Sequence, residues 1–353
     1  MPKPNQKLIA DRLSLSTTTV SRCFTNHPKI NPETRAQVFQ LAAELGYNYT
    51  VQRNGSSKKD SRNTIAVIVG TEKSATAEKE IAAEVLKGIS EKAASEGLEI
   101  EVHYVNPSES LPKIRSRKII KNKSCVHWKG IVLLYDFQEE AVSNILAKFP
   151  TVSALEDYDN VDVDCVGQDQ VRGISKIMQH LYSLGHRRIG FLSWKYPVDA
   201  PWVHRRLGAY FENLYRLGLN VDLRLVLNLR NEESIPLEEL SRQAAELVQD
   251  GVTAWVCAAD HQAYRLMSDF RLLGISVPED CSITGYDGQL PPNGMPQVTT
   301  IQMPFRDIGV SCITSLIRKM QHPVAMRRNL QVSGELLTGA TTSQIAVADS
   351  ALA

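Results

Sequence analysis

The spacing of apolar residues near the start of the chain predicts three short helices. Leu8, Ile9 and Leu13 recur at helical spacing, and Val20 and Phe24 stand four residues apart in a second segment. A third stripe consists of Val38, Leu41, Ala42 and Leu45. Three short helices with a tight turn between the first two describe a helix-turn-helix domain.

Polar residues at the expected helix ends support these boundaries. Ser16 is placed to cap the second helix and Asn31 the third, because both side chains can accept a hydrogen bond from a free backbone N–H. Pro32 suits a first helical position, and Gly46 suits a stop.

From residue 64 the pattern changes to apolar runs that alternate with amphipathic helices such as 81–97. The runs cover 64–70, 98–105, 129–135, 151–155, 188–193, 253–258, 282–287 and 298–303. Such alternation indicates parallel sheets covered on both faces by helices. About 280 residues are too many for one compact unit, so we expect two doubly wound α/β lobes with ligands bound at strand carboxyl ends, in a cleft between the lobes.

These patterns divide the chain into parts. Residues 1–49 form the helix-turn-helix headpiece, and the Gly/Ser-containing, charged stretch 50–63 reads as a flexible linker. Residues 64–343 form the two-lobed core, and 344–353 a flexible tail. We expect one lobe to combine 64–165 with 304–330, and the other to combine 166–303 with 331–343.

Charge is distributed unevenly between these parts. Residues 1–63 hold 10 Lys or Arg against 4 Asp or Glu, and the remaining chain holds 30 against 35. A basic N-terminal segment on an acidic body is typical of nucleic-acid binding, although a basic arm without a partner would have the same composition.

The second helix holds the headpiece side chains that could bind nucleic acid. If Val20 and Phe24 face inward, then Thr17, Thr18, Ser21 and Arg22 face outward. Hydroxyl groups can bind base edges or phosphates, and Arg can bind guanine through two hydrogen bonds. Short side chains would let this helix enter a major groove.

At this point the chain resembles the lactose-repressor family of bacterial transcription regulators. The headpiece match is carried by SLSTTTVSRCF and NPETRAQVFQLAAELGYN, and the core match by HLYSLGHRRIGFLS, LGISVPEDCSITGYDG and VTTIQMPFRDIGVSC. The matching blocks run from residue 8 to about residue 343. The resemblance implies a headpiece joined to a core similar to periplasmic sugar-binding proteins.

The resemblance assigns roles to headpiece residues. It implies base readout by Thr17, Thr18 and Arg22. Phosphate contacts are implied for Ser16, Ser21, Asn26 and Thr34. The family has a hinge helix after the headpiece, with an apolar wedge that kinks DNA, but here Asn54-Gly55-Ser56 disfavours a helix. Arg53 could still contact phosphate or the minor groove.

The resemblance also implies an effector site. Its residues are Arg205, read as the arginine three positions before Gly208, together with Asp287, Phe305, Asp260, Trp202 and Trp194. The two tryptophans could equally serve lobe packing. Ala259 replaces an asparagine common in the family, so the site either suits a less polar ligand or has lost affinity for simple sugars.

Other classes of function lack their signatures. No G-x-S-x-G, H-E-x-x-H, P-loop or G-x-G-x-x-G motif occurs, so we expect no enzyme and no cofactor. The alternating aspartates of 157–169 lack the central Gly and final Glu of a calcium loop, and they indicate a half-exposed strand instead of a metal site. The six cysteines have no metal-type or redox-type spacing. No secretory signal and no run of about 18 apolar residues is present, so we expect a cytoplasmic protein without a membrane span.

We therefore predict a homodimeric transcription regulator, most simply a repressor. It would bind a pseudo-palindromic operator in double-stranded DNA and respond to a small effector, a sugar or sugar derivative. The alternative is a two-lobed solute-binding protein or sensor without operator-specific DNA binding.

Overall fold

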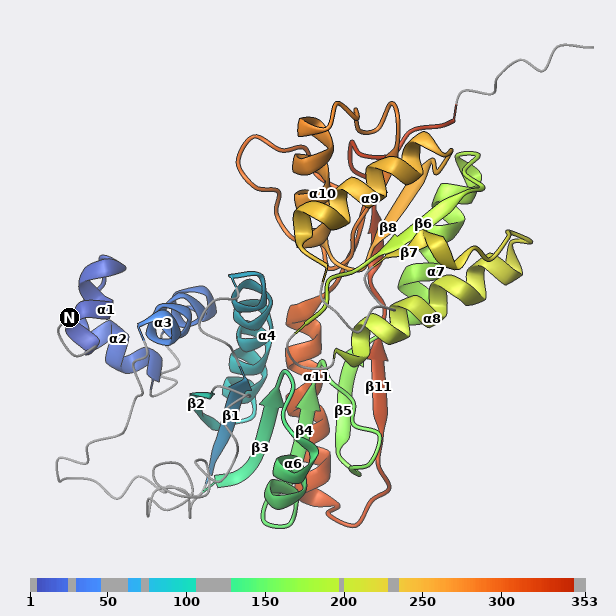
Figure 1. The fold of residues 1–353 in the computed structure, drawn as a ribbon. Coiled ribbons are helices and arrows are strands. Elements are labelled where there is room, and N and C mark those ends of the chain that lie inside the picture. The colour runs from blue at the N-terminus through green and yellow to red at the C-terminus, as the bar shows by residue number, and fades with distance from the viewer. Residues whose placement is uncertain are drawn as a thin grey trace, which may run out of the picture. The chain divides into compact units, whose positions relative to one another are not determined.

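The computed structural model describes residues 5–24, 30–45, 63–70, 76–105, 128–196, 200–227 and 235–345. The chain divides into two compact units, and each is described by itself (Figure 1). Unit 1 comprises 1–167 and 304–332, and unit 2 comprises 168–303 and 333–353. The chain therefore passes from one unit to the other three times.

Unit 1 begins with the headpiece helices α1 (Gln6–Arg12), α2 (Thr17–Phe24) and α3 (Pro32–Glu44). Ser16 caps α2 as predicted, because its Oγ accepts from the Thr19 N–H at 3.0 Å. Asn31 caps α3 by accepting from the Glu33 N–H at 2.7 Å. Ile9, Val20 and Val38 are buried, so the predicted apolar stripes form the headpiece core. The predicted stop at Gly46 and the linker lie outside the described residues.

The turn between α1 and α2 takes a left-handed residue. Ser14 has φ +54°, and the Leu15 N–H then reaches the Ala10 carbonyl at 2.9 Å. This backbone region is the one that glycine adopts most readily, so a serine here occupies a conformation that favours glycine. A Cβ in that conformation costs roughly 1–2 kcal/mol.

Replacing Ser14 by glycine should therefore stabilise the headpiece. We expect Ser14→Gly to raise the free energy of unfolding of α1 and α2 by about 0.5–1 kcal/mol, since the relief of strain exceeds glycine's extra chain entropy. Hydrogen exchange of the Val20 and Leu15 amides measures the change. Ser14→Ala is the control and should give no gain; equal gains from Ala and Gly would show that strain at Ser14 is negligible.

The rest of unit 1 is a six-stranded sheet within the described residues, in the order β11-β5-β4-β3-β1-β2. β1, β2, β3, β4 and β5 pair in parallel, as expected from the sequence. The bounds are β1 Thr64–Gly70, α4 Thr76–Ser95, β2 Glu99–Val105, β3 Trp128–Leu134, α6 Glu139–Leu146, β4 Thr151–Ala154, β5 Asp164–Gln168, α11 Phe305–Gln321 and β11 Asn329–Val332.

Helices cover both faces of this sheet (Figure 1). On one face, Val142 and Ile145 of α6 join Ile131 and Leu133 of β3 in one buried cluster. On the other face, Leu316 of α11 lies over β3, and α11 runs beside α4. The two helices come from opposite ends of the core sequence, so unit 1 closes only through a long-range contact.

The aspartates of 157–163 are not in a strand, contrary to the sequence expectation; β5 begins only at Asp164. Asp164 is buried and accepts from Arg318. Asp157 accepts from Arg327, which precedes β11, and from Asn329, the first residue of β11. Asp157 and Asp164 therefore form ion pairs with α11 and with the segment after it, which local periodicity does not reveal.

Unit 2 contains a four-stranded parallel sheet in the order β7-β6-β8-β9. A short antiparallel pair, β10 with β12, adjoins it in the chain. The bounds are α7 Gln170–Ser183, β6 Ile189–Leu192, α8 Pro201–Arg216, β7 Val226–Leu227, α9 Leu237–Gln249, β8 Ala254–Cys257, α10 Asp260–Leu272, β9 Ser282–Thr284, β10 Thr300–Gln302 and β12 Glu335–Leu337.

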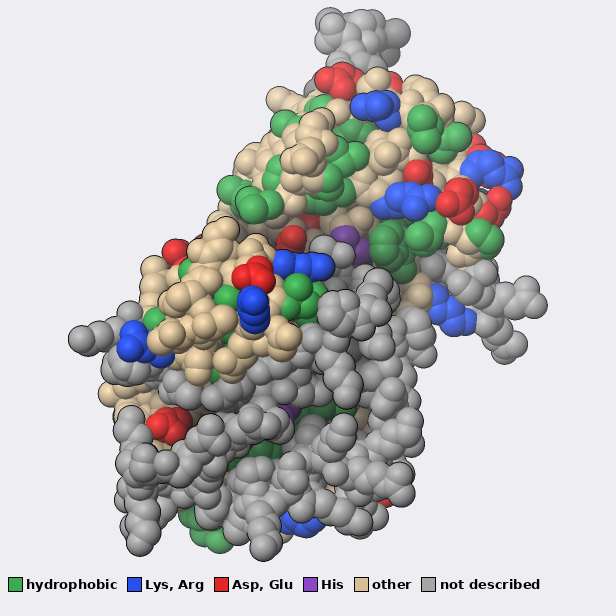
Figure 2. All heavy atoms as spheres, turned by 90° about the vertical axis from the view of Figure 1, so that its left-hand side faces the viewer, with side chains coloured by type: hydrophobic (Ala, Val, Ile, Leu, Met, Phe, Trp, Pro, Cys, Tyr) green, Lys and Arg blue, Asp and Glu red, His purple; other side chains and the backbone are tan. Residues whose placement is uncertain are grey.

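The sheet of unit 2 is also doubly covered. One face packs on α9 and α10, where Leu240, Phe270 and Trp255 share a buried cluster. On the α8 side, the Tyr210 hydroxyl donates to the Ile189 carbonyl at 2.7 Å. Hydrophobic side chains also gather on the outer surface of this unit in Figure 2, and Leu272 and Leu290 are 80% and 84% exposed. No helix in the described ranges is long and apolar enough to cross a membrane.

A buried histidine ties the last described segment to unit 2. The Ser343 carbonyl can only accept, so His186 Nε2 donates to it at 3.2 Å, and Nδ1 accepts from the Thr253 hydroxyl at 3.0 Å. The bond at Nδ1 requires a neutral ring, because a protonated Nδ1 has no lone pair with which to accept. Burial lowers the pKa of His186 to about 4, and the neighbouring His180 and Arg187 charges act in the same direction.

The contribution of His186 to the stability of unit 2 should consequently be lost in acid. The unfolded chain binds a proton at His186 near the ordinary pKa of 6.5, whereas the folded chain resists it until about pH 4. The stabilising contribution is thus complete above pH 6.5 and declines as the pH falls toward 4, by about 3 kcal/mol at most. Urea unfolding at several pH values measures this slope.

Two variants isolate the contribution of His186. His186→Gln should remove from the slope the contribution of one proton between about pH 4 and 6.5, about 1.4 kcal/mol per pH unit. His261 contributes with the same sign and Asp260 with the opposite sign, and both contributions cancel when the variant is compared with the unsubstituted protein. His322→Gln, at an exposed position after α11, should leave the slope unchanged. An unchanged slope in His186→Gln would mean that the ring is not held neutral.

Candidate functional site

The second headpiece helix presents a polar face to solvent. Thr17, Thr18 and Arg22 are exposed, whereas Val20, Cys23 and Phe24 are buried. Ser16 and Thr19 share a hydrogen bond of 2.8 Å between their hydroxyls at the start of α2. The outward side chains proposed for base readout therefore lie together on one helix face, next to the helix N-terminus, where backbone N–H groups favour phosphate.

The remaining headpiece candidates are placed only in part. Ser21 and Thr34 are half-buried, on α2 and α3. Asn26 and Arg53 lie outside the described residues.

A second polar cluster lies in unit 2, at the carboxyl ends of its parallel strands. Strand β6 leads into Ser193 and Trp194, β8 into Ala258 and Asp260, and β9 into Tyr286 and Asp287. This is the edge at which open parallel sheets bind ligands, because the loops there are free to diverge.

Arg206 of α8 is the centre of this cluster. Its side chain is 2% exposed, and its NH2 group lies 3.0 Å from Asp287 Oδ1. The arginine that contacts Asp287 is thus Arg206, one position after the Arg205 assigned from the sequence. Arg206 belongs to the buried stripe of α8 with Val203 and Tyr210, whereas Arg205 is half-buried one position away.

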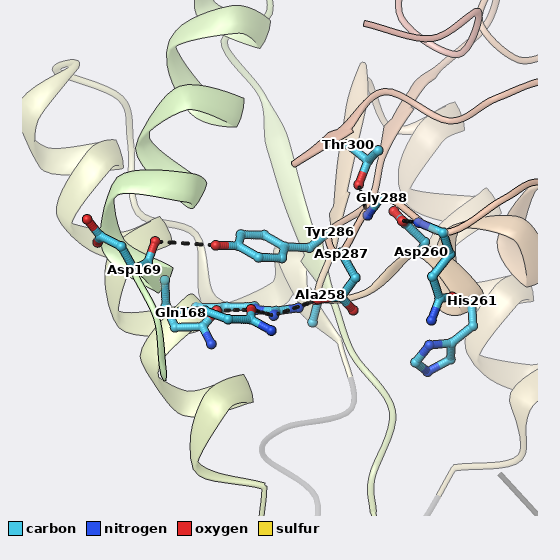
Figure 3. Close-up of polar contacts among 12 residues, drawn as sticks. Gln168, Asp169, Ala258, Asp260, His261, Tyr286, Asp287, Gly288 and Thr300 are labelled. Carbon is cyan, nitrogen blue, oxygen red and sulfur yellow. Dashed lines mark hydrogen bonds and ion pairs between the residues drawn. The ribbon is translucent and has the colours of Figure 1, made fainter. Parts of the chain in front are cut away.

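Polar groups from three parts of the chain bind the Arg206 guanidinium, and Gln168, Ala258 and Asp287 among them are labelled in Figure 3. Nε donates to Gln170 Oε1 at 2.6 Å, NH1 to the Ala258 carbonyl, and NH2 to Gln168 Oε1 at 2.8 Å. Neither glutamine is apparent from the sequence as a site residue, since both lie where β5 passes into α7 and match no motif that we recognised. Both side chains accept hydrogen bonds from Arg206, so their role depends on the position of that residue in the folded chain.

Aromatic rings complete the surroundings of Arg206. The guanidinium carbon lies 3.7 Å from the Tyr286 ring centre and 4.7 Å from that of Trp202. Trp202 in turn packs against Tyr196 with ring centres 5.4 Å apart, and Trp194 meets His261 edge-on at 4.8 Å. Trp202 is therefore part of the cluster around Arg206, whereas Trp194 packs against His261 in the first turn of α10.

The two aspartates at this edge have different environments. Asp287 adopts φ +113° and is 7% exposed; burial raises the pKa of its carboxyl, while Arg206 opposes the increase. Asp260 is fully buried and accepts from the Gln289 N–H at 2.7 Å. Burial, followed by the nearby Asp287, raises the pKa of Asp260 to about 8. Asp260 thus holds the 286–289 loop in place, and its side chain is not exposed to solvent.

Phe305 is the remaining candidate from the sequence. It begins α11 in unit 1, and its side chain is 7% exposed. Among the described residues no group of three or more His, Cys, Asp or Glu side chains is arranged to hold a metal ion.

Comparison with known proteins identifies both parts of the chain. Residues 7–49 match the family described as "Bacterial regulatory proteins, lacI family", and residues 178–342 match the "Periplasmic binding protein-like domain". The HTH-type transcriptional repressor CytR of Escherichia coli K12 is 29% identical over 321 residues, covering 89% of each chain.

Solved structures share the fold over most of the chain. The transcriptional regulator CelR in complex with cellobiose aligns with a TM-score of 0.66 at 21% identity, covering 96% of this chain and 99% of its own. The lac repressor dimer bound to operator and the anti-inducer ONPF aligns with a TM-score of 0.62 at 19% identity, with the same coverage. The headpiece-plus-core architecture expected from the sequence is thereby confirmed.

Proposed function

Because the chain belongs to the lactose-repressor family of bacterial transcription regulators, we propose that it binds a specific DNA operator and releases or retains it in response to a small effector. We further propose that it acts as a repressor in the cytoplasm, as a homodimer. The headpiece supplies DNA recognition and the two-lobed core supplies effector binding. Its relatives are regulators, and the proposal includes no reaction catalysed by this chain.

The exposed face of α2 carries the proposal for DNA binding. Thr17, Thr18 and Arg22 are the outward residues of the second helix of a helix-turn-helix, which is the helix that enters the major groove in this motif. Their hydroxyl, methyl and guanidinium groups can read base edges. The proposed phosphate contacts are Ser16, Ser21, Asn26 and Thr34, with Arg53 from the linker.

Two copies of the headpiece would read two half-sites. A dimer with two-fold symmetry binds a pseudo-palindrome, since each half of the site meets the same surface. The lac repressor relative is described as a dimer on its operator.

The cluster around Arg206 carries the proposal for effector binding. Asp287, Trp202 and the loops after β6 and β8 lie with it at the ligand-binding edge of a parallel sheet. CelR is described with bound cellobiose, which supports a carbohydrate as the effector class here. Coupling between such a site and DNA affinity typically amounts to about 1–3 kcal/mol.

Selection of genomic fragments by the purified protein tests the regulator assignment. The selection is carried out at low and at near-physiological salt. We expect one pseudo-palindromic motif that survives the higher salt, because base contacts persist when counterions weaken phosphate attraction. Recovery of unrelated fragments that are all lost at higher salt would contradict operator-specific binding and favour the solute-binding alternative.

Substitution of Arg22 tests the reading face itself. Arg22→Ala should weaken binding to the selected operator by about 1–3 kcal/mol and relax preference at one position of each half-site. Fluorescence anisotropy on a set of single-base operator variants measures both effects. Arg12→Ala, an exposed arginine at the end of α1, is the matched control and should leave base preference intact. A uniform loss on all sequences would make Arg22 a phosphate contact instead.

A further inference from the structure

The headpiece makes a buried contact with the first core helix, and both belong to unit 1. Arg35 of α3 is 2% exposed, and Ser90 of α4 is 1% exposed. Arg35 Nη1 donates to Ser90 Oγ, while Arg35 Nη2 donates to the Ile30 carbonyl at 3.4 Å within the headpiece. Helix α3 lies beside α4 (Figure 1). One guanidinium therefore bonds to the headpiece and to α4 at the same time.

Arg35 is also held from the side of α2. Burial lowers the pKa of the Arg35 guanidinium, and the Cys23 thiol of α2 is near enough to interact with that charge. Burial raises the pKa of Cys23 to about 11, and Arg35 opposes the increase. A hydrogen bond to a buried charged group is stronger and more directional than one between neutral groups. The contact with Ser90 can therefore fix the orientation of the headpiece on α4.

The contact leaves the proposed reading face uncovered. Thr17, Thr18 and Arg22 are exposed, whereas Cys23 on the other side of α2 is buried. Docking of the headpiece on α4 and reading of DNA thus use different sides of the headpiece, so one headpiece can do both at once.

The sequence of the linker does not favour a rigid connection between headpiece and core. Asn54-Gly55-Ser56 disfavours a helix there. A tether of Gly/Ser-containing, charged composition sets the local concentration of what it holds, but it does not set an orientation. Coupling between distant sites needs a physical element with two discrete arrangements. Docking and undocking of the headpiece supply such an element.

The residues of α4 around Ser90 connect this contact to the point where the chain re-enters unit 1. Glu91 accepts from Arg306 of α11, at 2.8 Å from Nε, and Arg306 follows Pro304, the first residue after the crossing, by two positions. Gly88 brings the backbone of α4 against the Arg306 carbonyl. Because closely packed elements transmit displacement with little compression, a shift of α11 at the crossing moves Ser90 as well.

We propose that the headpiece is coupled to the core by docking of α3 on α4 through Arg35 and Ser90, and that the docked headpiece is the form that binds the operator. This inference rests on the proposed function and adds the route of its regulation. Docking fixes the orientation of α2 before DNA is met, so less freedom is lost on binding. An effector that displaces α11 at the crossing favours the undocked form and lowers operator affinity.

Hydrogen exchange of the full-length protein without DNA tests the docking. Ser90→Arg places a second cation against Arg35 and leaves the headpiece sequence intact. We expect the α3 amides, that of Val38 among them, to exchange about tenfold faster, because the headpiece loses a hydrogen bond to a charged group. Ser95→Arg, at an exposed position of α4, adds the same charge and should leave the exchange unchanged.

A second variant covers the case in which Ser90→Arg does not fold. Ser90→Ala removes only the acceptor, and it should speed exchange of the same amides in the same direction by a smaller factor. Unchanged exchange of the α3 amides in the folded Ser90 variant would show that the headpiece is not held by this contact, and it overturns the inference.

Arg306→Gln tests the route from the crossing to the headpiece. It breaks the pair with Glu91 on α4, and we expect the α3 amides to exchange about threefold faster. Lys92→Gln breaks the ion pair with Glu96 on the same helix and is the matched control, with no expected effect. Equal exchange in the two variants would mean that α11 does not act on the headpiece through Glu91, which contradicts the inference.

Operator binding separates this inference from the function on which it rests. Fluorescence anisotropy on the selected operator should show that Ser90→Arg binds about tenfold more weakly than Ser95→Arg. Faster exchange in Ser90→Arg without weaker binding overturns the claim that the docked form binds DNA, and leaves the regulator assignment standing. If the unsubstituted protein forms no specific DNA complex, the proposed function fails, while hydrogen exchange still decides whether the headpiece docks.

Discussion

Arg206→Ala is expected to lower the free energy of unfolding of unit 2 by about 3–5 kcal/mol and to abolish effector response. The substitution leaves the buried Asp287 carboxylate without its cation, and it leaves the Gln168 and Gln170 oxygens and the Ala258 carbonyl without a donor. Each unsatisfied buried group adds a desolvation cost. Urea unfolding followed by tryptophan fluorescence measures the loss, and operator release measures the response.

Arg205→Ala is the matched control for this prediction. Arg205 adjoins Arg206 in α8 but is half-buried, and we expect a loss of less than about 1 kcal/mol. Arg206→Met combined with Asp287→Asn should recover part of the stability lost in Arg206→Ala, because no unpaired charge remains. If Arg205→Ala lowers the free energy of unfolding or the effector response more than Arg206→Ala does, Arg205 is the site arginine, as assigned from the sequence, and Arg206 is not.

The second large effect is expected where α4 crosses α11. A Cβ on Gly88 would lie 1.8 Å from the Arg306 carbonyl oxygen, and one on Gly309 would lie 2.1 Å from the Val85 carbonyl oxygen. Both obstacles are backbone atoms of the facing helix, so no side chain can move aside. The two glycines thus permit the helices to touch through their backbones.

Gly309→Val should destabilise unit 1 by about 3 kcal/mol or more, since the helices must separate to admit the side chain. Calorimetric unfolding of the full chain measures the loss. Gly208→Ala in α8 is the control: nothing lies within 4 Å of the added Cβ, and alanine favours helix, so a gain of roughly 0.5–1 kcal/mol is expected. A mild effect of Gly309→Val would mean that α4 and α11 are not packed so closely in solution.

Local patterns were sufficient to predict most of the fold class. The headpiece helices, their caps at Ser16 and Asn31 and the parallel strands of both units follow from spacing within a few neighbouring residues. Strands β7, β11 and β12 were not predicted. They are short, they pair with strands far away in the sequence, and β11 is largely exposed, so it has no apolar run of its own.

The sequence did not show which of two adjacent arginines, Arg205 or Arg206, contacts Asp287. Asp287 and Trp202, both proposed from the sequence, lie beside Arg206, but two adjacent arginines in α8 cannot be distinguished by counting back from Gly208. Helical periodicity offers the missing signal, because Arg206 lies three residues after the apolar Val203 and four before Tyr210. Gln168 and Gln170 depend on the junction of β5 and α7, which only the folded chain defines.

The contact of α4 with α11 also sets an order of events during synthesis on the ribosome. Unit 1 needs α11, yet the ribosome makes all of residues 168–303 before it reaches Phe305. While most of unit 2 emerges from the ribosome, the sheet formed by β1–β5 is therefore incomplete. The face of α4 that later packs against α11 stays exposed during this time. Slow translation before residue 304 would prolong that exposure, so codon choice in this stretch should affect the yield of folded protein more than the same change after residue 321.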